Sequence, residues 1–122
     1  MRLIRIKNNG VFCALVESDS VVITDAQSAI DLLMSAKYDV GTKNILISKQ
    51  LIAEDFFVLS TGFAGEVLQK FVNYDGRIAI YGDYSHYTSK PLKDFIYESN
   101  KGKDIFFVAT KDEAIDKLTK NH

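Results

Sequence analysis

A chain of 122 residues with 47% hydrophobic content is long enough to bury one core, so we expect a single domain over residues 1–122. Fifteen Lys and Arg against sixteen Asp and Glu give a formal charge of -1, which argues against a nucleic-acid-binding protein. The sequence has no stretch near the roughly 20 apolar residues that cross a bilayer, and its alternating start is unlike a signal peptide. We therefore expect a cytoplasmic protein with no membrane partner.

One cysteine and two histidines are too few for a zinc-type ligand set or an internal disulfide. We therefore predict that the protein binds neither a metal ion nor a cofactor. Cys13 lies in the apolar run 11–16, which is typical of a small buried side chain and not of a reactive thiol.

The first elements are two strands and a helix. Residues 3–7 and 11–16 have strand patterns, and Asn8-Asn9-Gly10 between them favours a tight antiparallel hairpin. After a short extended stretch at 21–23, Thr24 and Gln27 predict a capping box for a helix that ends near Lys37. Residues 44–48 do not alternate, which indicates a strand buried on both faces.

The second half of the chain alternates helices with strands. Apolar residues recur at helical spacing from Ala64 to Val72, and Pro91 suits the first turn of another helix, which ends near Gly102. Buried strands are predicted at 77–82 and 105–109, and Asp112 opens a closing helix. The sequence therefore predicts an α/β fold in which an N-terminal β-hairpin is followed by three β-α repeats. The expected sheet is five-stranded, mixed and mostly parallel, with about four helices and with consecutive strands adjacent.

The run from Leu59 to Leu68 combines a hydroxyl pair and two glycines with the opening of an amphipathic helix. The first N–H groups of a helix lack intrahelical partners and carry the positive end of the helix dipole, so they can hold an anion or a partner's oxygen. We expect a phospho-acceptor or partner-contact site there, formed by Ser60, Thr61, Gly62 and Gly65. The structural alternative is that Ser60 or Thr61 only caps the helix and the glycines only allow close packing.

The order of elements, together with Ser60-Thr61-Gly62-Phe63-Ala64, the stretch 89–107 and Asp112-Glu113-Ala114-Ile115, resembles the STAS domain of sulfate transporters and anti-sigma-factor antagonists. The resemblance spans nearly the whole chain and implies a STAS-like fold with a regulatory role. It places Ser60 at the position that is phosphorylated in antagonists and implies a kinase or regulator as partner. Leu59 stands where antagonists have an aspartate, and the approach 49–59 is longer than theirs.

A second resemblance is more specific. Glu54-Asp55-Phe56-Phe57, Thr61-Gly62, the stretch 68–74 and the stretch 94–102 are similar to the bacterial family called domain of unknown function 4180. This resemblance implies no activity.

The connection 51–59 is too apolar for an ordinary solvated loop. Because its adjacent phenylalanines cannot all face one core from a regular helix or strand, we expect an interaction surface that contacts a protein partner or a second copy in a homodimer. Its predicted residues are Phe56, Phe57, Leu59 and Phe63. A loop that wraps the sheet edge is the alternative. Glu54 and Asp55 point in different directions on a helix, so we predict no catalytic residue among them.

A second candidate site follows the strand 77–82 at the carboxyl edge of the sheet, where open α/β folds bind ligands. Asp83, Tyr84, Ser85 and His86 form this possible ligand loop. The sequence therefore supports two functions. One is a non-enzymatic interaction module that uses 56–65 and the loop before the third helix as one surface, and the other is a small-molecule binder or weak enzyme that uses Asp83, Ser85 and His86. A deep pocket between Ser60 and His86 would favour the second function.

Overall fold

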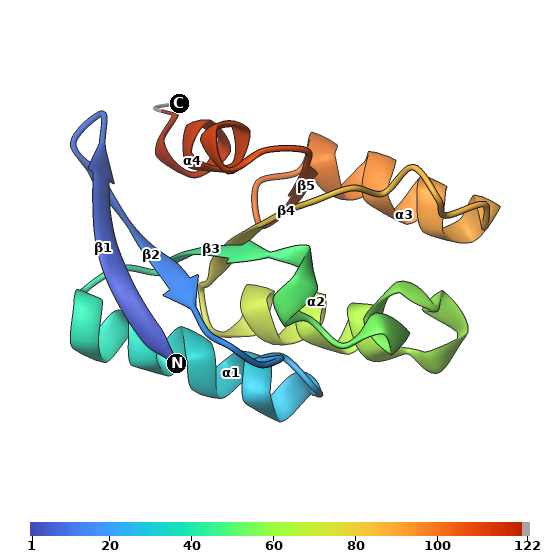
Figure 1. The fold of residues 1–122 in the computed structure, drawn as a ribbon, viewed down its shortest axis with the longest axis horizontal. Coiled ribbons are helices and arrows are strands. Elements are labelled where there is room, and N and C mark those ends of the chain that lie inside the picture. Colours follow the sequence, from blue (N-terminus) through green and yellow to red (C-terminus); the bar gives the residue numbers. More distant parts are fainter. Residues whose placement is uncertain (121–122) are drawn as a thin grey trace.

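The computed structural model describes residues 1–120, whose arrangement is shown in Figure 1. A five-stranded sheet has its strands in chain order, from β1 to β5. The first two strands pair antiparallel, and the other three run parallel to the second. The strands are β1 (Arg2–Asn8), β2 (Val11–Glu17), β3 (Asn44–Ser48), β4 (Arg77–Tyr81) and β5 (Ile105–Val108). The predicted α/β class, the mixed sheet and the adjacency of consecutive strands are confirmed.

Four helices cover the two faces of the sheet, and α4 lies on the opposite side from α1 and α2 (Figure 1). They are α1 (Ala26–Ser35), α2 (Phe63–Asn73), α3 (Lys90–Lys101) and α4 (Lys111–Thr119). The first three pack on one face with Ile45, Ile47 and Ile80, whereas α4 packs on the other with Leu46 and Ala79. Within residues 1–120, no helix is long and apolar enough to cross a membrane.

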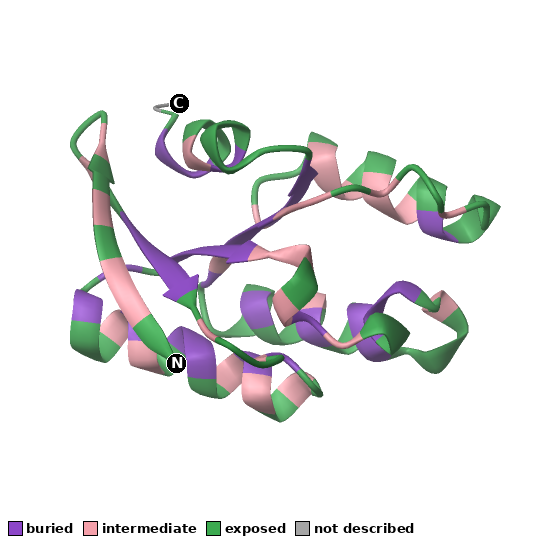
Figure 2. Cartoon of the chain, viewed as in Figure 1, coloured by how far each residue is buried: buried purple, intermediate pink, exposed green. Residues whose placement is uncertain are grey.

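The strands are buried as their apolar runs predict. Figure 2 shows β2 and β3 buried along most of their length, whereas β1 alternates between exposed and partly buried residues. Asn9 and Gly10 have φ values of 52° and 75°, the left-handed conformation that a two-residue hairpin turn needs at both positions. Cys13 is fully buried, and this burial raises the pKa of its thiol to about 11, as expected for an inert side chain.

The capping box predicted for α1 is wrong by one residue. It is formed by Asp25 and Ser28, one residue beyond the predicted pair of Thr24 and Gln27. The Asp25 carboxylate accepts from the Ser28 N–H at 2.7 Å, and the N–H groups of Thr24 and Asp25 both donate to the Ser28 hydroxyl. At the other end α1 stops at Ser35, close to the predicted Lys37. A π-helical turn follows at Ala36–Val40 and ends at Gly41 in the left-handed conformation.

The long connection after β3 contains three short 3₁₀ turns, at Lys49–Leu51, Glu54–Phe57 and Leu59–Thr61. It is fastened to the extended stretch before α1, because Ile23 accepts a hydrogen bond from Ala53 at 2.9 Å and donates one to Leu51 at 3.1 Å. The connection is therefore an ordered part of the fold and holds a fixed position at the carboxyl edge of the sheet.

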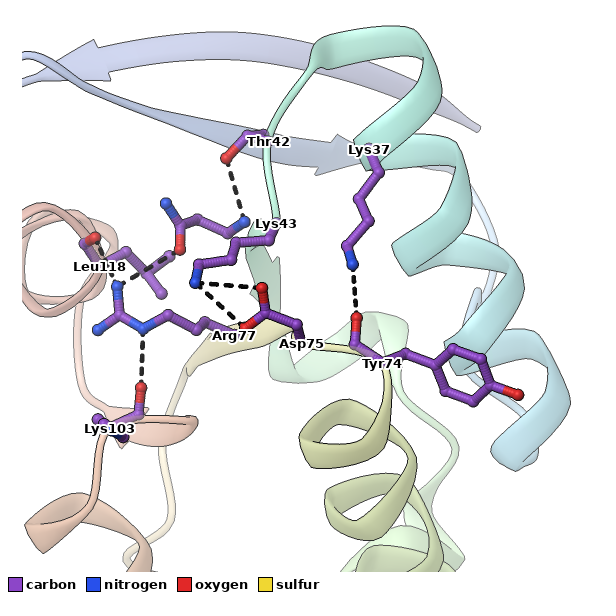
Figure 3. Close-up of polar contacts among 9 residues, drawn as sticks. Lys37, Thr42, Lys43, Tyr74, Asp75, Arg77, Lys103 and Leu118 are labelled. Atoms are coloured by element: carbon purple, nitrogen blue, oxygen red, sulfur yellow. Dashed lines mark hydrogen bonds and ion pairs between the residues drawn. The ribbon is translucent and has the colours of Figure 1, made fainter.

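Arg77, the first residue of β4, joins the amino edge of the sheet to two other elements (Figure 3). Its guanidinium donates to the carbonyls of Lys117 (3.3 Å) and Leu118 (3.0 Å), which lie in the last turn of α4. It also donates to the Lys103 carbonyl at 2.7 Å, before β5. One side chain thus links β4 by hydrogen bonds to the end of α4 and to the segment before β5.

The Arg77→Met variant is expected to lower the free energy of unfolding by about 2 kcal/mol, because several carbonyls lose a charged donor while the side-chain stem is kept. Urea denaturation measures this loss. Lys103→Ala is the matched control, since Arg77 uses only the backbone carbonyl of Lys103. Equal stability of the two variants would contradict the role given to the guanidinium.

Candidate binding cleft at the carboxyl edge of the sheet

The parallel register of β3 and β4 brings two distant loops together. Ser48 pairs with Tyr81, so Lys49 and Gly82 lie side by side just beyond the two strands. A Cβ added to Gly82 would lie 2.7 Å from the Lys49 Cβ, a distance that real side chains do not tolerate. Because position 82 has no side chain, the connection 49–61 and the loop 82–89 can start in contact at the edge where open α/β sheets bind ligands.

A polar contact also connects the two loops, 49–61 and 82–89, further from the strands. The Tyr87 hydroxyl lies 2.8 Å from both carboxylate oxygens of Glu54 and donates to them. The Lys49 ammonium lies 3.7 Å from the same carboxylate and 4.9 Å from the ring centres of both Phe57 and Tyr87. His86 Nε2 lies 3.9 Å from Glu54 Oε1. The Glu54 carboxylate is therefore close to three polar side chains. Tyr87 and His86 belong to the facing loop, and Lys49 belongs to the same connection as Glu54.

A cleft of about 440 Å³ lies beside this contact, between Ser60 on one loop and His86 on the other. Its lining is largely apolar and includes Val58, which is 49% exposed, and the partly buried Leu59. Pro91, in the first turn of α3, closes one side. The structure thus brings Ser60 and His86, one residue from each candidate site, to the same cleft.

The hydroxyl pair does not open α2 in the predicted way. Ser60 and Thr61 belong to a 3₁₀ turn, and the N-cap of α2 is Gly62, whose φ of 79° favours glycine. The Thr61 hydroxyl lies 2.8 Å from the Val58 carbonyl and accepts from the Phe63 N–H at 3.2 Å. The first amide of α2 is therefore already hydrogen-bonded within the chain. Ser60 is exposed at the cleft. Gly65, on the exposed side of α2, lines a separate groove between α2 and α3.

The expectation that the phenylalanines at positions 56, 57 and 63 form an interaction surface is wrong. Phe56, Phe57 and Phe63 are only 1%, 3% and 8% exposed. A 3₁₀ turn, unlike a regular helix or strand, lets the adjacent Phe56 and Phe57 both turn inward, with ring centres 4.9 Å apart in an edge-to-face arrangement. Leu59 is partly buried. The connection therefore packs its phenylalanines into the core on the face that α1, α2 and α3 cover.

The predicted ligand loop divides into one partly buried residue and three exposed residues. Tyr84 packs against Phe57 and Phe107, and its hydroxyl donates to the Ile80 carbonyl at 2.6 Å, so it supports the fold. Asp83, Ser85 and His86 are exposed. Hydrogen bonds from Ser85 hold the pKa of the Asp83 carboxyl below its ordinary value of 3.8. Asp83 lies on a second crevice, of about 660 Å³, with Ala109, Glu113 and Lys117.

Sequence reasoning missed the residues that join the loops, Lys49 and Tyr87, and the exposed Val58. The signal that could have found Lys49 is the strand register, because the first residues after two paired parallel strands are neighbours. Among residues 1–120, no group of three or more His, Cys, Asp or Glu side chains could hold a metal ion.

A family model described as Domain of unknown function (DUF4180) matches residues 8–118. This chain belongs to that family. The predicted resemblance to domain of unknown function 4180 is thereby confirmed, and the match covers strands β2 to β5 and both loops of the cleft. No curated protein and no solved structure matches the chain.

The Gly82→Ala variant is expected to lose about 1–3 kcal/mol of stability, because the new methyl group would overlap the Lys49 Cβ and push the ends of β3 and β4 apart. Gly65→Ala is the matched control, since a Cβ at position 65 meets nothing within 4 Å. In a helix that change is neutral or gains up to about 1 kcal/mol. Urea denaturation of both variants measures the difference, and similar stabilities would contradict the close approach at Gly82.

Alkaline pH should weaken the fold through the tyrosines of this region. Burial raises the pKa of Tyr84 and of Tyr87 above the ordinary value of 10.0, and the Glu54 carboxylate adds to the shift at Tyr87. A raised pKa means that the neutral phenols stabilise the folded state below pH 10 and that this stability is lost as the pH rises further.

We expect the urea midpoint to fall above about pH 10, and to fall less steeply in the double variant Tyr84→Phe and Tyr87→Phe. Tyr97→Phe, at a position that is 62% exposed, serves as the control. The near-ultraviolet absorbance of phenolate follows the titration directly. Ionisation of all six tyrosines in one transition near pH 10 would contradict the assignment.

Proposed function

We propose that this chain is a non-enzymatic protein-interaction module with a STAS-like regulatory role, and that the cleft between residues 58–60 and 86–91 is its contact surface. The observation that carries the proposal is the Glu54–Tyr87 hydrogen bond at 2.8 Å, which joins both loops into one ordered surface. A small-molecule site normally offers polar groups that await a ligand. Here Lys49, Glu54 and Tyr87 already interact with one another, and the rest of the lining is mostly apolar or hydroxyl-bearing, with the exposed His86 beside it.

The proposed regulation acts on the hydroxyls at this surface. Ser60 is exposed on the cleft, and a phosphate on it would add nearly two negative charges beside an apolar docking surface, which disfavours an apolar partner and favours a basic one. Thr61 is the weaker candidate acceptor, because its hydroxyl is engaged with the backbone of Val58 and Phe63. The STAS resemblance supports a kinase or another regulator as the partner, and a second copy of the chain is the alternative.

A photo-crosslinking residue at Val58 tests the contact surface in the source cells. We expect a discrete adduct, either with another protein or with a second copy, and we expect Leu59→Asp to abolish it. The same residue at Tyr97, on the outer side of α3, is the control. Adducts that are no stronger at Val58 than at Tyr97 would contradict the proposal.

Intact mass of the chain purified from its source tests the regulatory part. The proposal predicts a phosphorylated form in at least one growth state, which Ser60→Ala removes and Thr61→Ala keeps. A single unmodified mass in every growth state would contradict it.

A second candidate function, binding of a small molecule, is favoured by the crevice of about 660 Å³ at Asp83, whose volume is in the range of ligand pockets. This function predicts that a cationic metabolite raises the melting temperature of the chain and that Asp83→Asn removes the increase.

A further inference from the structure

The two edge strands of the sheet, β1 and β5, differ in whether their outward backbone groups have hydrogen-bond partners. At β5, the Asn100 side chain acts in place of a further strand, because its amide accepts from the Phe107 N–H at 2.7 Å and donates to the Phe107 carbonyl at 3.0 Å. This contact blocks that edge against another chain. At β1, within residues 1–120, the strand pairs only with β2, and the Arg5 side chain donates to the Val40 carbonyl at the end of the π-helical turn. With seven residues, β1 is also longer than β3, β4 or β5.

The hairpin register identifies the outward-facing backbone groups of β1. The two-residue turn closes on the pair Asn8 and Val11, and in such hairpins the closing pair exchanges hydrogen bonds. Because bonding alternates along an antiparallel pair, Ile4 and Ile6 also bond to β2. Leu3, Arg5 and Lys7 therefore direct their N–H and C=O groups away from the sheet.

The side chains at this edge carry one sign of charge. The only charged side chains in residues 1–16 are Arg2, Arg5 and Lys7, and the first carboxylate of the chain is that of Glu17. Arg5 and Lys7 lie on the same face of β1 and flank Phe12, at 5.1 and 5.6 Å from its ring centre. Phe12 is itself 38% exposed. Arg2 is paired with Glu17 at 2.7 Å, so the open edge presents the charges of Arg5 and Lys7 beside one accessible aromatic ring.

A second copy of β1 is a poor occupant of this edge. In the antiparallel register that overlaps all seven residues, Arg5 of one copy lies directly opposite Arg5 of the other, and like charges at that distance are unfavourable. An extended segment with carboxylates at alternate positions would instead place one opposite Arg5 and one opposite Lys7. Cross-strand pairs of opposite charge stabilise such an arrangement.

We propose that β1 binds an extended acidic segment of another protein by strand addition, through the backbone of Leu3, Arg5 and Lys7 and with carboxylates facing Arg5 and Lys7. Backbone hydrogen bonds supply affinity in this mode of recognition, and the alternate side chains supply selectivity. This site is separate from the carboxyl-edge cleft and does not depend on the function proposed for it.

A short capped peptide of alternating valine and glutamate is the probe, and the same peptide with lysine for glutamate is its control. Hydrogen exchange on the full chain should show that the glutamate peptide protects the amides of Leu3, Arg5 and Lys7, while Ile4 and Ile6 are already protected. The lysine peptide should bind at least about tenfold more weakly, since two attractive cross-strand pairs become repulsive.

Two variants separate the contributions of backbone and charge. Lys7→Pro removes an outward N–H without removing a bond to β2, and it should abolish binding, whereas Lys7→Gln keeps the N–H and should weaken binding about threefold. Lys93→Gln, on α3, should change nothing. Three results would overturn the proposal: no new protection at the three outward amides, equal binding of the lysine peptide, or protection of these amides by self-association without peptide.

Discussion

The pairing of β3 with β4 is the constraint on which the candidate site depends. It places Lys49 against Gly82 and so determines where two loops begin that are separated by more than 30 residues in the chain. From that starting point the loops meet again at Glu54 and Tyr87. The geometry of the cleft therefore follows from the register of the sheet, and a side chain at position 82 would disturb both contacts.

A cluster of packed aromatic rings lies next to the cleft, on its core side. Phe57 stacks on Tyr87 with ring centres 5.3 Å apart and packs edge-to-face on Phe56, which in turn contacts Phe63 at the start of α2. Such contacts add to the burial of the rings and fix their orientation. The accessible apolar residues of this connection, such as Val58, are therefore held in place by packed rings. This order lowers the conformational entropy that the connection loses when a partner binds.

Hydrophobic periodicity was sufficient to predict the strands and the order of the sheet, because β3 and β5 are short apolar runs between turn residues. It could not predict the connection after β3, since 3₁₀ turns of three or four residues have no periodic signature, and the burial of Phe56 and Phe57 was therefore missed. The sequence predicts that the two candidate segments form one contact surface. The pairing of Glu54 with Tyr87 depends on side-chain positions that only the folded chain defines.

Glu54 and Tyr87 join the two loops into one surface, and a double-mutant cycle measures the free energy of this contact. Glu54→Ala, Tyr87→Phe and the double variant are compared by urea denaturation. Because the Glu54 side chain is 65% exposed, we expect a modest coupling free energy of about 0.5–1 kcal/mol. Effects that add to within about 0.3 kcal/mol would contradict the account.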